Sequence, residues 1–480
     1  MLRPKKLSAD EFSGHHGVNL NNTVMMDSHI FRAYDIRGDV RTQLTPEAVF
    51  VIGRALAEAR FAAGETVAVG RDAREHSPII AQKLIEGLTL QGVHVVDLGQ
   101  ITTPMLYFAL FGHDFDGGVM VTGSHNPIFD NGLKICRKTH SFLGEDIQAV
   151  YRRTLEPFEA ASERGTVRSL DVTQAYVDDI VSRVPAFSKL SIVIDAGNGV
   201  AGPFAQRLMS HYASELTSLY CDPDGSFPNH HPDPSVPKNL EDCRQVVLAK
   251  GAALGLGFDG DGDRLGVIDR DGTIIPADRL IVLFAREILS RRAQATIIGD
   301  VKCSKFTFDD IAHHGGTPVM SKTGHALIKA KIRETGAALA GEMSGHFFFE
   351  DRWFGFDDAL YAAARLVEIA ANAAQEGKSL QDLLSDLPQS CATPELRFDC
   401  PDDIKFELAK AMCAHYSKLY PTSDLDGARI DFPNGWALIR ASNTQPVIVM
   451  RVEADSAEAV NAIMADLKQE IARFGVQLED

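Results

Sequence analysis

The chain reads Ala252-Ala253-Leu254-Gly255-Leu256-Gly257-Phe258 and continues directly into Asp259-Gly260-Asp261-Gly262-Asp263-Arg264. The first stretch is a continuous apolar run with the length of a strand that is buried on both faces of a sheet. The second stretch is an acidic loop with glycines at alternate positions. Because ligands bind beyond the carboxyl ends of strands in parallel sheets, we expect a buried strand that delivers this loop to a functional site.

The same order of elements occurs three times along the chain. Each copy reads as strand, helix, strand, helix and strand, followed by a polar loop that contains glycine. The closing strands are expected at residues 118–121, 252–258 and 337–340, and the loops at residues 122–127, 259–264 and 341–346. The earlier strands are expected at residues 66–70, 93–98, 190–194, 215–220, 295–298 and 317–320, with a helix over residues 78–90. This alternation indicates βαβ units and mostly parallel sheets.

The last part of the chain has a different pattern. Strands are expected at residues 428–432, 436–439 and 447–452, with a turn at Asn434-Gly435 and a helix over residues 456–474. Strands followed by a helix indicate an α+β module. The predicted fold class is therefore α/β: three repeated α/β domains with mixed, mostly parallel sheets plus a C-terminal α+β domain, around a central cleft. The expected divisions are a polar N-terminal extension at residues 1–28 and domains at residues 29–170, 171–272, 273–387 and 388–480.

Length and composition agree with this organisation. The 480 residues suffice for three or four domains, and 45% hydrophobic with 24% charged residues is ordinary for a globular protein. The formal net charge of -17 argues against a nucleic-acid partner, because affinity for phosphate backbones comes from clustered Lys and Arg. No run of about 20 apolar residues occurs, so we expect no membrane partner and a cytoplasmic location. The seven cysteines form no C-x-x-C pair and are expected to be reduced thiols.

The first polar loop is Thr122-Gly123-Ser124-His125-Asn126-Pro127. Its glycine permits a close backbone approach, and Pro127 suits the first turn of a helix whose free amides would favour an anion. A phosphate on Ser124 would lie well there. Taken alone, the segment is better explained by a serine that caps a turn, so its interpretation depends on the other loops.

The second loop places Asp259, Asp261 and Asp263 at alternate positions, so that a curved loop can turn all three carboxylates toward one point. Such a cluster requires a cation, and hard oxygen ligands together with a phosphate substrate favour Mg²⁺. An EF-hand is excluded because Arg264 stands where that loop needs Gly, and Arg270 where it needs Glu. A solvated acidic turn is disfavoured by the apolar strand that precedes it. Arg264 is suited to bidentate binding of a phosphate.

The third loop, at residues 341–346, places Glu342 and Ser344 two residues apart between glycines, which suits adjacent sugar hydroxyls. His346 and His325 are explained equally well as ordinary polar loop residues. A fourth loop reads Arg440-Ala441-Ser442-Asn443-Thr444 and offers a guanidinium, hydroxyls and an amide to a phosphate dianion. A polar hairpin turn is the alternative for this loop.

Together, the four motifs closely resemble those of the α-D-phosphohexomutase superfamily, and specifically its bacterial phosphomannomutase/phosphoglucomutase branch. The resemblance spans nearly the whole chain, from Phe31-Arg32-Ala33-Tyr34-Asp35-Ile36-Arg37-Gly38 to the last helix. It implies reversible phosphoryl transfer between C6 and C1 of mannose and glucose phosphates, through a phosphoserine and a bound hexose 1,6-bisphosphate. It also implies Mg²⁺ as the metal, hexose phosphates as the small-molecule partners, and a monomer or weak homo-oligomer.

The resemblance also assigns roles to individual residues. Ser124 is implied as the phosphoserine. The other residues implied in catalysis are His125, Lys134, Arg264, Arg37 and His346. Those implied in metal binding are Asp259, Asp261, Asp263 and Ser124. Those implied in substrate binding are Glu342, Ser344, Lys302, His325 and His346 at the sugar, and Arg440, Ser442, Asn443, Thr444 and Tyr34 at the phosphate that does not react.

Two other functions account for part of the pattern. A metal-dependent sugar phosphatase would share the nucleophile and the acidic loop but would not need a dedicated second phosphate loop, so residues 440–444 argue against it. A non-catalytic sugar-phosphate sensor would tolerate the loss of Ser124 or of the acids, which are all present. A mutase must also exclude water, and we expect the C-terminal domain to close over the distal phosphate for this purpose.

Overall fold

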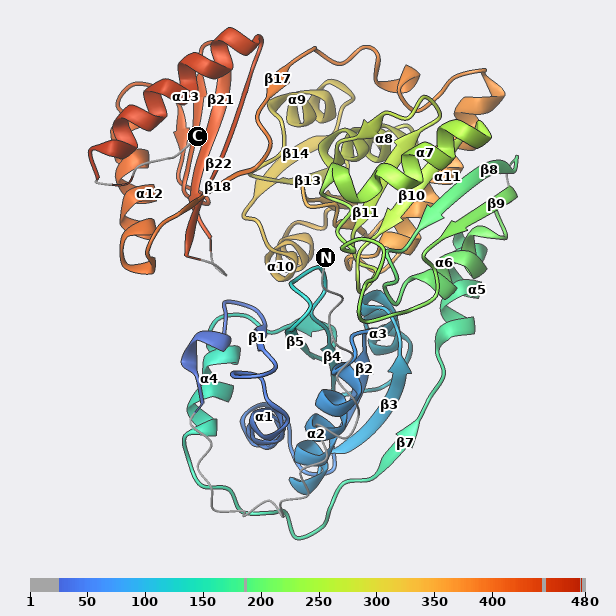
Figure 1. Ribbon diagram of the computed structural model, residues 1–480, viewed down its shortest axis with the longest axis vertical. Coiled ribbons are helices and arrows are strands. Elements are labelled where there is room, and N and C mark those ends of the chain that lie inside the picture. The colour runs from blue at the N-terminus through green and yellow to red at the C-terminus, as the bar shows by residue number, and fades with distance from the viewer. Residues whose placement is uncertain (1–25, 185–187, 443–445, 475, 477–480) are drawn as a thin grey trace.

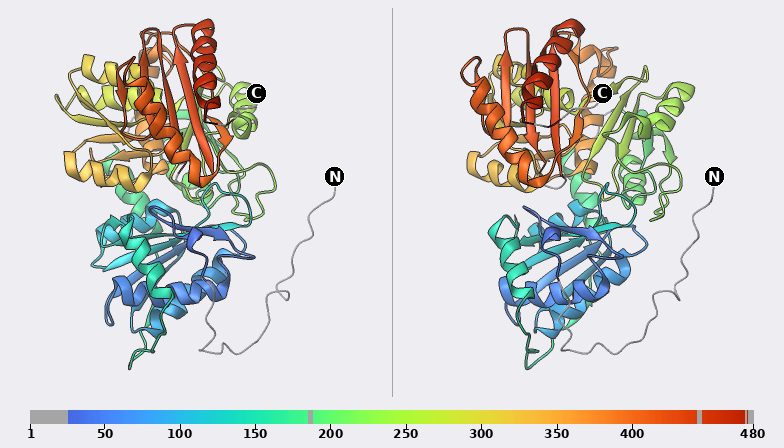
Figure 2. Two further views of the ribbon diagram at one scale, coloured as in Figure 1. Left: turned by 90° about the vertical axis from the view of Figure 1, so that its left-hand side faces the viewer. Right: turned by 60° about the vertical axis from the view of Figure 1, so that its left-hand side comes forward.

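The computed structural model describes residues 26–184, 188–442, 446–474 and 476, so residues 1–25 of the predicted extension lie outside it. In the described part of the chain the strands form four separate sheets that follow one another in sequence. Each sheet and its helices form one unit: the first, second, third and tail units. The first unit lies below the other three in Figure 1, and Figure 2 shows the same arrangement from two other sides.

The first unit has a sheet of order β1-β5-β4-β2-β3-β7, with β6 paired to β5. Its strands are β1 (Ile36–Asp39), β2 (Thr66–Arg71), β3 (His94–Gln100), β4 (Gly117–Val121), β5 (Asp130–Arg137), β6 (His140–Ser141) and β7 (Val167–Ser169). Its helices are a 3₁₀ turn (Ser28–Ile30), α1 (Pro46–Arg60), α2 (Ser77–Leu90), α3 (Thr103–Gly112) and α4 (Glu145–Thr154). Helices cover both faces, because Val67 of β2 packs in one apolar cluster with α1 and α2, whereas Ala68 packs in another with α3.

The second unit has the strand order β12-β11-β10-β8-β9, and the third unit has the order β14-β13-β15-β16. The second contains α5 (Thr173–Arg183), β8 (Leu190–Asp195), α6 (Gly202–Met209), β9 (Ala213–Leu219), a 3₁₀ turn (Pro237–Leu240), α7 (Glu241–Lys250), β10 (Leu254–Phe258), β11 (Leu265–Asp269) and β12 (Ile274–Ile275). The third contains α8 (Ala277–Leu289), β13 (Thr296–Asp300), α9 (Lys305–His313), β14 (Thr317–Ser321), α10 (His325–Thr335), β15 (Leu339–Gly341), β16 (Phe347–Phe349), α11 (Ala359–Gln375) and a 3₁₀ turn (Asp382–Leu384).

The predicted threefold repeat is confirmed. In each unit the closing strand runs parallel to an earlier one: β4 to β2, β10 to β8, and β15 to β13. Each closing strand then turns back through a polar loop into an antiparallel neighbour, which makes the sheets mixed: β5, β11 and β16. The three loops therefore leave from equivalent carboxyl edges of their sheets.

One apolar core runs through the first three units. It contains Met105 of α3, Leu208 of α6, Phe284 of α8 and Leu366 of α11, all with 0% exposure. The tail unit has a core of its own. The first three units therefore share one core, whereas the tail has its own core and meets the third unit through a small apolar cluster.

The tail unit consists of a sheet and two helices, α12 and α13. Its sheet has the order β17-β22-β21-β20-β19, with β18 paired to β22. Its elements are β17 (Cys391–Ala392), β18 (Leu396–Asp399), α12 (Asp402–Tyr416), β19 (Thr422–Ser423), β20 (Ala428–Phe432), β21 (Gly435–Ala441), β22 (Val447–Ala454) and α13 (Ala457–Ala472). The three strands and the last helix agree with the prediction, but α12 and the short strands before it were not predicted. The hairpin turn is Pro433-Asn434, because Gly435 already pairs with Phe432.

Strand β21 distributes its side chains over two faces. Ala437 and Ile439 pack in the core beneath α12 and α13, whereas Trp436 and Leu438 pack with Val301 of the third unit. By the period of two, Arg440 belongs to the face of Trp436 and Leu438. The strand therefore carries this arginine on the side of the third unit.

Two further properties concern the chain as a whole. Within the described residues, none of the helices has the length and apolar character that a bilayer span requires. The seven cysteines are all free thiols.

Candidate active site

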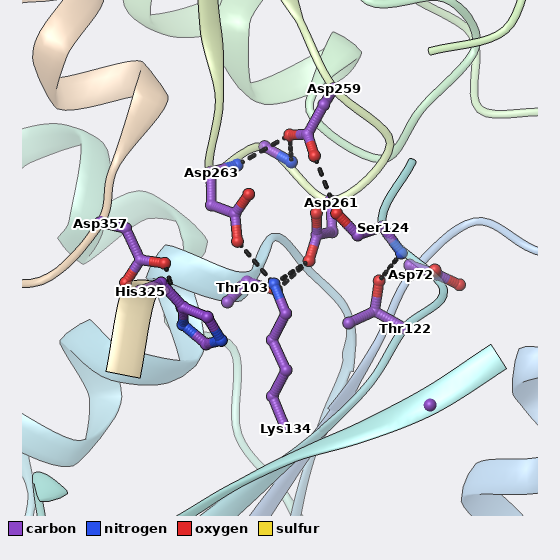
Figure 3. Close-up of polar contacts among 12 residues, drawn as sticks. Asp72, Thr103, Thr122, Ser124, Lys134, Asp259, Asp261, Asp263, His325 and Asp357 are labelled. Atoms are coloured by element: carbon purple, nitrogen blue, oxygen red, sulfur yellow. Dashed lines mark hydrogen bonds and ion pairs between the residues drawn. The ribbon is translucent and has the colours of Figure 1, made fainter. Parts of the chain in front are cut away.

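The β4–β5 loop and the β10–β11 loop meet in Figure 3, where Ser124 faces Asp259 and Asp261. Ser124 Oγ donates to Asp259 Oδ2 at 3.0 Å. Gly260 permits this approach, because a Cβ atom there would lie 2.5 Å from the carbonyl oxygen of Ser124. The nucleophile candidate and the acidic loop are thus in direct contact.

Asp259 shapes the acidic loop. Its Oδ1 accepts hydrogen bonds from the amides of Gly262, Asp263 and Arg264 at 3.0, 3.0 and 3.1 Å. Gly262 supplies the left-handed backbone of this turn, with φ 77°. Ligand oxygens of Asp259, Asp261 and Asp263 consequently lie within 4.8 Å of one another. The three carboxylates converge, as their alternate spacing predicts.

Cationic side chains balance these buried acids. Lys134 on β5 places Nζ 2.8 Å from Asp261 Oδ2 and 2.5 Å from Asp263 Oδ2. Burial disfavours its charge, but the two carboxylates outweigh burial and raise the pKa of Lys134 well above its usual range. Burial, Asp263 and Asp261 together raise the pKa of Asp259. The repulsion among the acids is thus only partly relieved by protein cations.

The donor set fits Mg²⁺. Thr103 and Lys134 bind one oxygen of Asp261 at 2.6 and 2.8 Å, whereas its buried Oδ1 has no hydrogen-bond partner among the described residues. A buried carboxylate oxygen without a partner is costly unless a cation or water meets it. A site formed by three converging carboxylates offers oxygen ligands, and such a ligand set suits Mg²⁺ better than zinc. Asp259, Asp261, Asp263 and an oxygen on Ser124 would hold the ion.

The segment around Ser124 is a turn, which corrects the helix expected from Pro127. All of residues 122–130 are described, and β5 already begins at Asp130. Ser124 adopts the left-handed backbone, with φ 48°, and its amide donates to Thr122 Oγ1 at 2.8 Å. The proline preference for a first helical turn misled the prediction, because the return strand leaves no room for a helix.

His125 and Arg37 flank the serine. His125 Nδ1 lies 3.1 Å from Ser124 Oγ. Burial, reinforced by the charges of Arg264 and Arg37, lowers the pKa of His125 well below its usual range. Its ring is therefore neutral and a weak base. Arg37 is tied to the same turn, since its NH1 donates to Asn126 Oδ1 at 3.2 Å.

The loop at residues 341–346 joins the acidic loop from the third unit. His346 Nε2 lies 3.1 Å from Asp263 Oδ1, and its Nδ1 lies 3.0 Å from both Ser344 Oγ and Glu342 Oε2. Burial opposes a charge on His346, but Asp263, with Glu342, raises its pKa to about 9. Glu342 Oε1 also accepts from the amide of Gly324 at 2.6 Å. Glu342, Ser344 and His346 therefore form one hydrogen-bonded group.

His325, the first residue of α10, lies beside this group. Its Nδ1 is 3.3 Å from Asp357 Oδ2, and Lys329 Nζ is 2.9 Å from the other oxygen of Asp357. Tyr34 packs edge-on against His325 with ring centroids 5.3 Å apart. Burial, together with Asp35 and Glu342, raises the pKa of Tyr34 to about 12, so its hydroxyl stays protonated.

The tail unit brings Arg440 toward the third unit. Arg440 Nε donates to Asp426 Oδ2 at 3.0 Å, and the same oxygen accepts from the amide of Thr323 at 3.2 Å. Lys302 Nζ lies 3.2 Å from Glu395 Oε2. Ser442 is buried. Asn443 and Thr444 lie outside the described residues.

Several buried polar residues of the site escaped the prediction from sequence. These are Arg74, Thr103, Lys329 and Asp357. Arg74 follows strand β2, and Asp357 follows the aromatic run that ends at Phe356. A polar residue just beyond an apolar segment is the signal that located the other loops; it was available for Asp357, which directly follows Phe356, and for Arg74, three residues beyond the end of β2.

Comparison with known families divides the chain into four parts. The families are described as α/β/α domains I, II and III and the C-terminal domain of phosphoglucomutase/phosphomannomutase, and they match residues 28–160, 174–272, 276–391 and 395–470.

Similar proteins extend over the same length. A phosphomannomutase/phosphoglucomutase of Pseudomonas aeruginosa is 46% identical over 449 residues, which covers 93% of this chain and 96% of that protein. A phosphoglucomutase of Neisseria gonorrhoeae is 45% identical over 448 residues, with coverage of 92% and 96%. The crystal structure of a phosphoglucomutase/phosphomannomutase family protein from Burkholderia thailandensis has a TM-score of 0.86 at 44% identity, with coverage of 94% and 98%.

Proposed function

Because the chain belongs to the phosphoglucomutase/phosphomannomutase family of the α-D-phosphohexomutase superfamily, we propose that it interconverts the 6-phosphates and 1-phosphates of mannose and glucose through a phosphate carried on Ser124. The observation that carries this proposal is the 3.0 Å contact of Ser124 Oγ with Asp259 in the buried acidic loop. A serine beside three carboxylates is a poor site for a phosphate unless a metal ion is also bound there. The contact therefore links the nucleophile to the cation.

In the first half-reaction, a hexose hydroxyl attacks the phosphorus of phosphoserine. The new bond joins phosphorus to the sugar oxygen, the bond from phosphorus to Ser124 Oγ breaks, and the proton of the sugar hydroxyl passes to Ser124 Oγ. The product is a hexose 1,6-bisphosphate, which turns so that its other phosphate faces the serine. Ser124 Oγ then attacks that phosphate, the bond from phosphorus to the sugar oxygen breaks, and the serine proton passes to that oxygen. His125 Nδ1, 3.1 Å from Ser124 Oγ, orients the hydroxyl.

The surrounding residues supply charge and orientation. Bound Mg²⁺ would neutralise negative charge on the transferring oxygens. Lys134, Arg264 and Arg37 carry positive charge beside these oxygens. The cationic His346 contacts Asp263 of the acidic loop and Glu342 of its own loop. Glu342, Ser344, Lys302 and His325 would bind the sugar.

The second phosphate-binding site is assigned to the tail unit. Arg440 lies on the face of β21 toward the third unit, and Ser442 directly follows the end of this strand. Together with Asn443, Thr444 and Tyr34, these residues would hold the phosphate that is not reacting. The proposal places the protein in the cytoplasm and keeps the domain divisions near residues 170, 272 and 387.

Two measurements test the proposal. Coupled assays with glucose 1-phosphate and mannose 1-phosphate, each with a trace of the corresponding bisphosphate and with Mg²⁺, should show hexose 6-phosphate formation. Intact-mass analysis should show one phosphate on active protein and none on Ser124→Ala, which should lose most turnover but keep substrate binding. Release of inorganic phosphate without hexose 6-phosphate from a substrate labelled at C1 would instead indicate a phosphatase.

A further inference from the structure

Residues 124–130, which we call the nucleophile turn, present most of their carbonyl groups to one arginine. Arg74 NH2 donates to the carbonyl oxygens of Ser124 and Asn126 at 2.9 and 2.6 Å. Arg74 NH1 donates to those of Pro127 and Asp130 at 2.7 and 3.0 Å. A single guanidinium thus binds four carbonyls of the turn.

The remaining carbonyls of the turn have donors from three other places. His231 Nε2 donates to the carbonyl of His125. His76 Nε2 donates to that of Ile128 at 3.0 Å, and the amide of Val40 donates to that of Phe129 at 2.9 Å. Each carbonyl from Ser124 to Asp130 therefore has a hydrogen-bond donor.

We propose that Arg74, His76 and His231 form a clamp that fixes the carbonyl side of the nucleophile turn and so positions Ser124 Oγ for phosphoryl transfer. They are positioning residues, because they touch the backbone of the turn and act through Ser124. The inference rests on the proposed function of Ser124.

The burial of Arg74 shows how strongly the clamp depends on these contacts. Arg74 is 1% exposed, and its guanidinium has only donors, which must find acceptors when water is excluded. The left-handed backbone of Ser124, with φ 48°, is itself unfavourable for a residue with a side chain and persists only where the surroundings impose it. Arg74 holds this backbone conformation at the carbonyl of Ser124, and the hydrogen bond from the Ser124 amide to Thr122 Oγ1 holds it at the amide.

His76 has one tautomer in this arrangement. Asn131 Oδ1 accepts from the amide of Gly132 at 2.8 Å, which leaves its Nδ2 to donate to His76 Nδ1 at 2.8 Å. Since Nδ1 accepts a hydrogen bond, Nε2 carries the proton that is donated to the carbonyl of Ile128. Burial lowers the pKa of His76, which agrees with a neutral ring.

His231 reaches the turn from the second unit, on a strap formed by residues 222–234. Gly225 of this strap packs on the segment of Arg74, because a Cβ atom there would lie 2.4 Å from the amide of Glu75. The ring of Phe227 lies 5.4 Å from the Arg74 guanidinium. The second unit, which carries the acidic loop, thus also contributes His231 to the clamp and packs on the segment of Arg74.

Arg74→Lys tests the clamp, because an ammonium group cannot span four carbonyls as a guanidinium does. We expect kcat to fall by about tenfold to a hundredfold, with the KM for glucose 1-phosphate within about twofold of its original value. The phosphorus NMR signal of the phosphoserine should also shift. Arg365→Lys is the matched control: Arg365 is likewise 1% exposed but binds Asp351, Tyr361 and Glu287. It should leave kcat and the signal unchanged.

A second pair of variants keeps the test decisive if Arg74→Lys does not fold. His231 is exposed, so it can be replaced without opening the core. His231→Ala should lower kcat, and His231→Gln, which retains an N–H donor, should restore most of it. The clamp is overturned if kcat is unchanged in both His231→Ala and Arg74→Lys. If Arg74→Lys is unfolded, an unchanged kcat in His231→Ala alone overturns it. In either case the proposed function stands as long as Ser124→Ala is inactive. An active Ser124→Ala would overturn the proposed function, and the clamp with it.

Discussion

The Oγ atom of Ser124 lies 3.0 Å from Oδ2 of Asp259, although the two residues are 135 positions apart in the sequence. The contact joins loops from two different sheets. The chemistry of the serine therefore depends on how closely the first two units dock, and glycine at position 260 is one requirement for that docking.

Asp261→Asn should weaken the response to Mg²⁺. The substitution removes one negative charge from the three converging carboxylates, so the Mg²⁺ concentration for half-maximal activity should rise by about tenfold or more. Turnover at saturating Mg²⁺ should also fall. The measurement is a Mg²⁺ titration of the coupled assay, with Asp271→Asn, in an exposed turn of the same unit, as the control. Full activity of the original protein after exhaustive chelation by EDTA would show that the metal assignment is wrong.

Arg440→Ala should raise KM in both directions of the reaction. If Arg440 holds whichever phosphate is not reacting, it serves glucose 1-phosphate and glucose 6-phosphate alike. Loss of a charge-assisted contact to phosphate should cost about 2 to 5 kcal/mol of binding. Steady-state kinetics with both substrates decides the matter, and Arg473→Ala is the control, because Arg473 is an exposed arginine of the same unit. A defect with only one of the two substrates would contradict a single site in which the bisphosphate turns around.

Glu342→Gln should lower kcat/KM for the glucose and mannose substrates together. Its carboxylate is fixed by the Gly324 amide and by His346, so the charge that would meet a sugar hydroxyl has a defined place. If that hydroxyl is shared by glucose and mannose, kcat/KM for both 1-phosphates should fall while their ratio stays within about threefold. Glu350→Gln, in a surface ion pair with Arg292, should change neither value. A large change in the ratio would place Glu342 at a hydroxyl that distinguishes the sugars.

Glu395→Gln should lower stability near neutral pH but not in acid. Burial opposes the charge of Glu395, but Lys302, with Arg397, lowers its pKa to about 2 from the ordinary 4.5. Between pH 4.5 and about pH 2, Glu395 therefore binds fewer protons in the folded protein than in the unfolded chain. The stabilisation from its charge is present above pH 4.5 and is lost as the pH falls toward 2. Urea midpoints at about pH 6 and about pH 3 should show a difference between the two proteins that shrinks at the lower pH. Glu334→Gln, at an exposed pair with Lys331, should show no such dependence.

The repeated architecture was predictable because strands such as β10 are buried on both faces and leave an uninterrupted apolar run in the sequence. Polar loops directly after such runs located Ser124, the three aspartates and Glu342. Helix α12 was missed because its members of the core cluster are Leu408, Met412 and Tyr416, and the residues between them are small or polar rather than strongly apolar. A spacing of four residues among them was the available signal.

The parts that sequence reasoning could not supply depend on tertiary contacts. Nothing local shows that Ser124 adopts a left-handed backbone, because four carbonyls must first find Arg74, 50 or more residues earlier in the chain. Asp357 is likewise defined by His325 and Lys329 on a different element, α10. The domain divisions and the individual roles of the site residues stay predictions.

The core shared by three units has a consequence for how the protein is synthesised. Met105 and Leu366 belong to one apolar cluster, so the partners of α3 are complete only when the chain has grown by some hundreds of residues. At roughly 5 to 20 residues per second, that interval amounts to tens of seconds on the ribosome. During it, the apolar face of α3 remains without its final partners and offers a binding surface to chaperones that attend nascent chains.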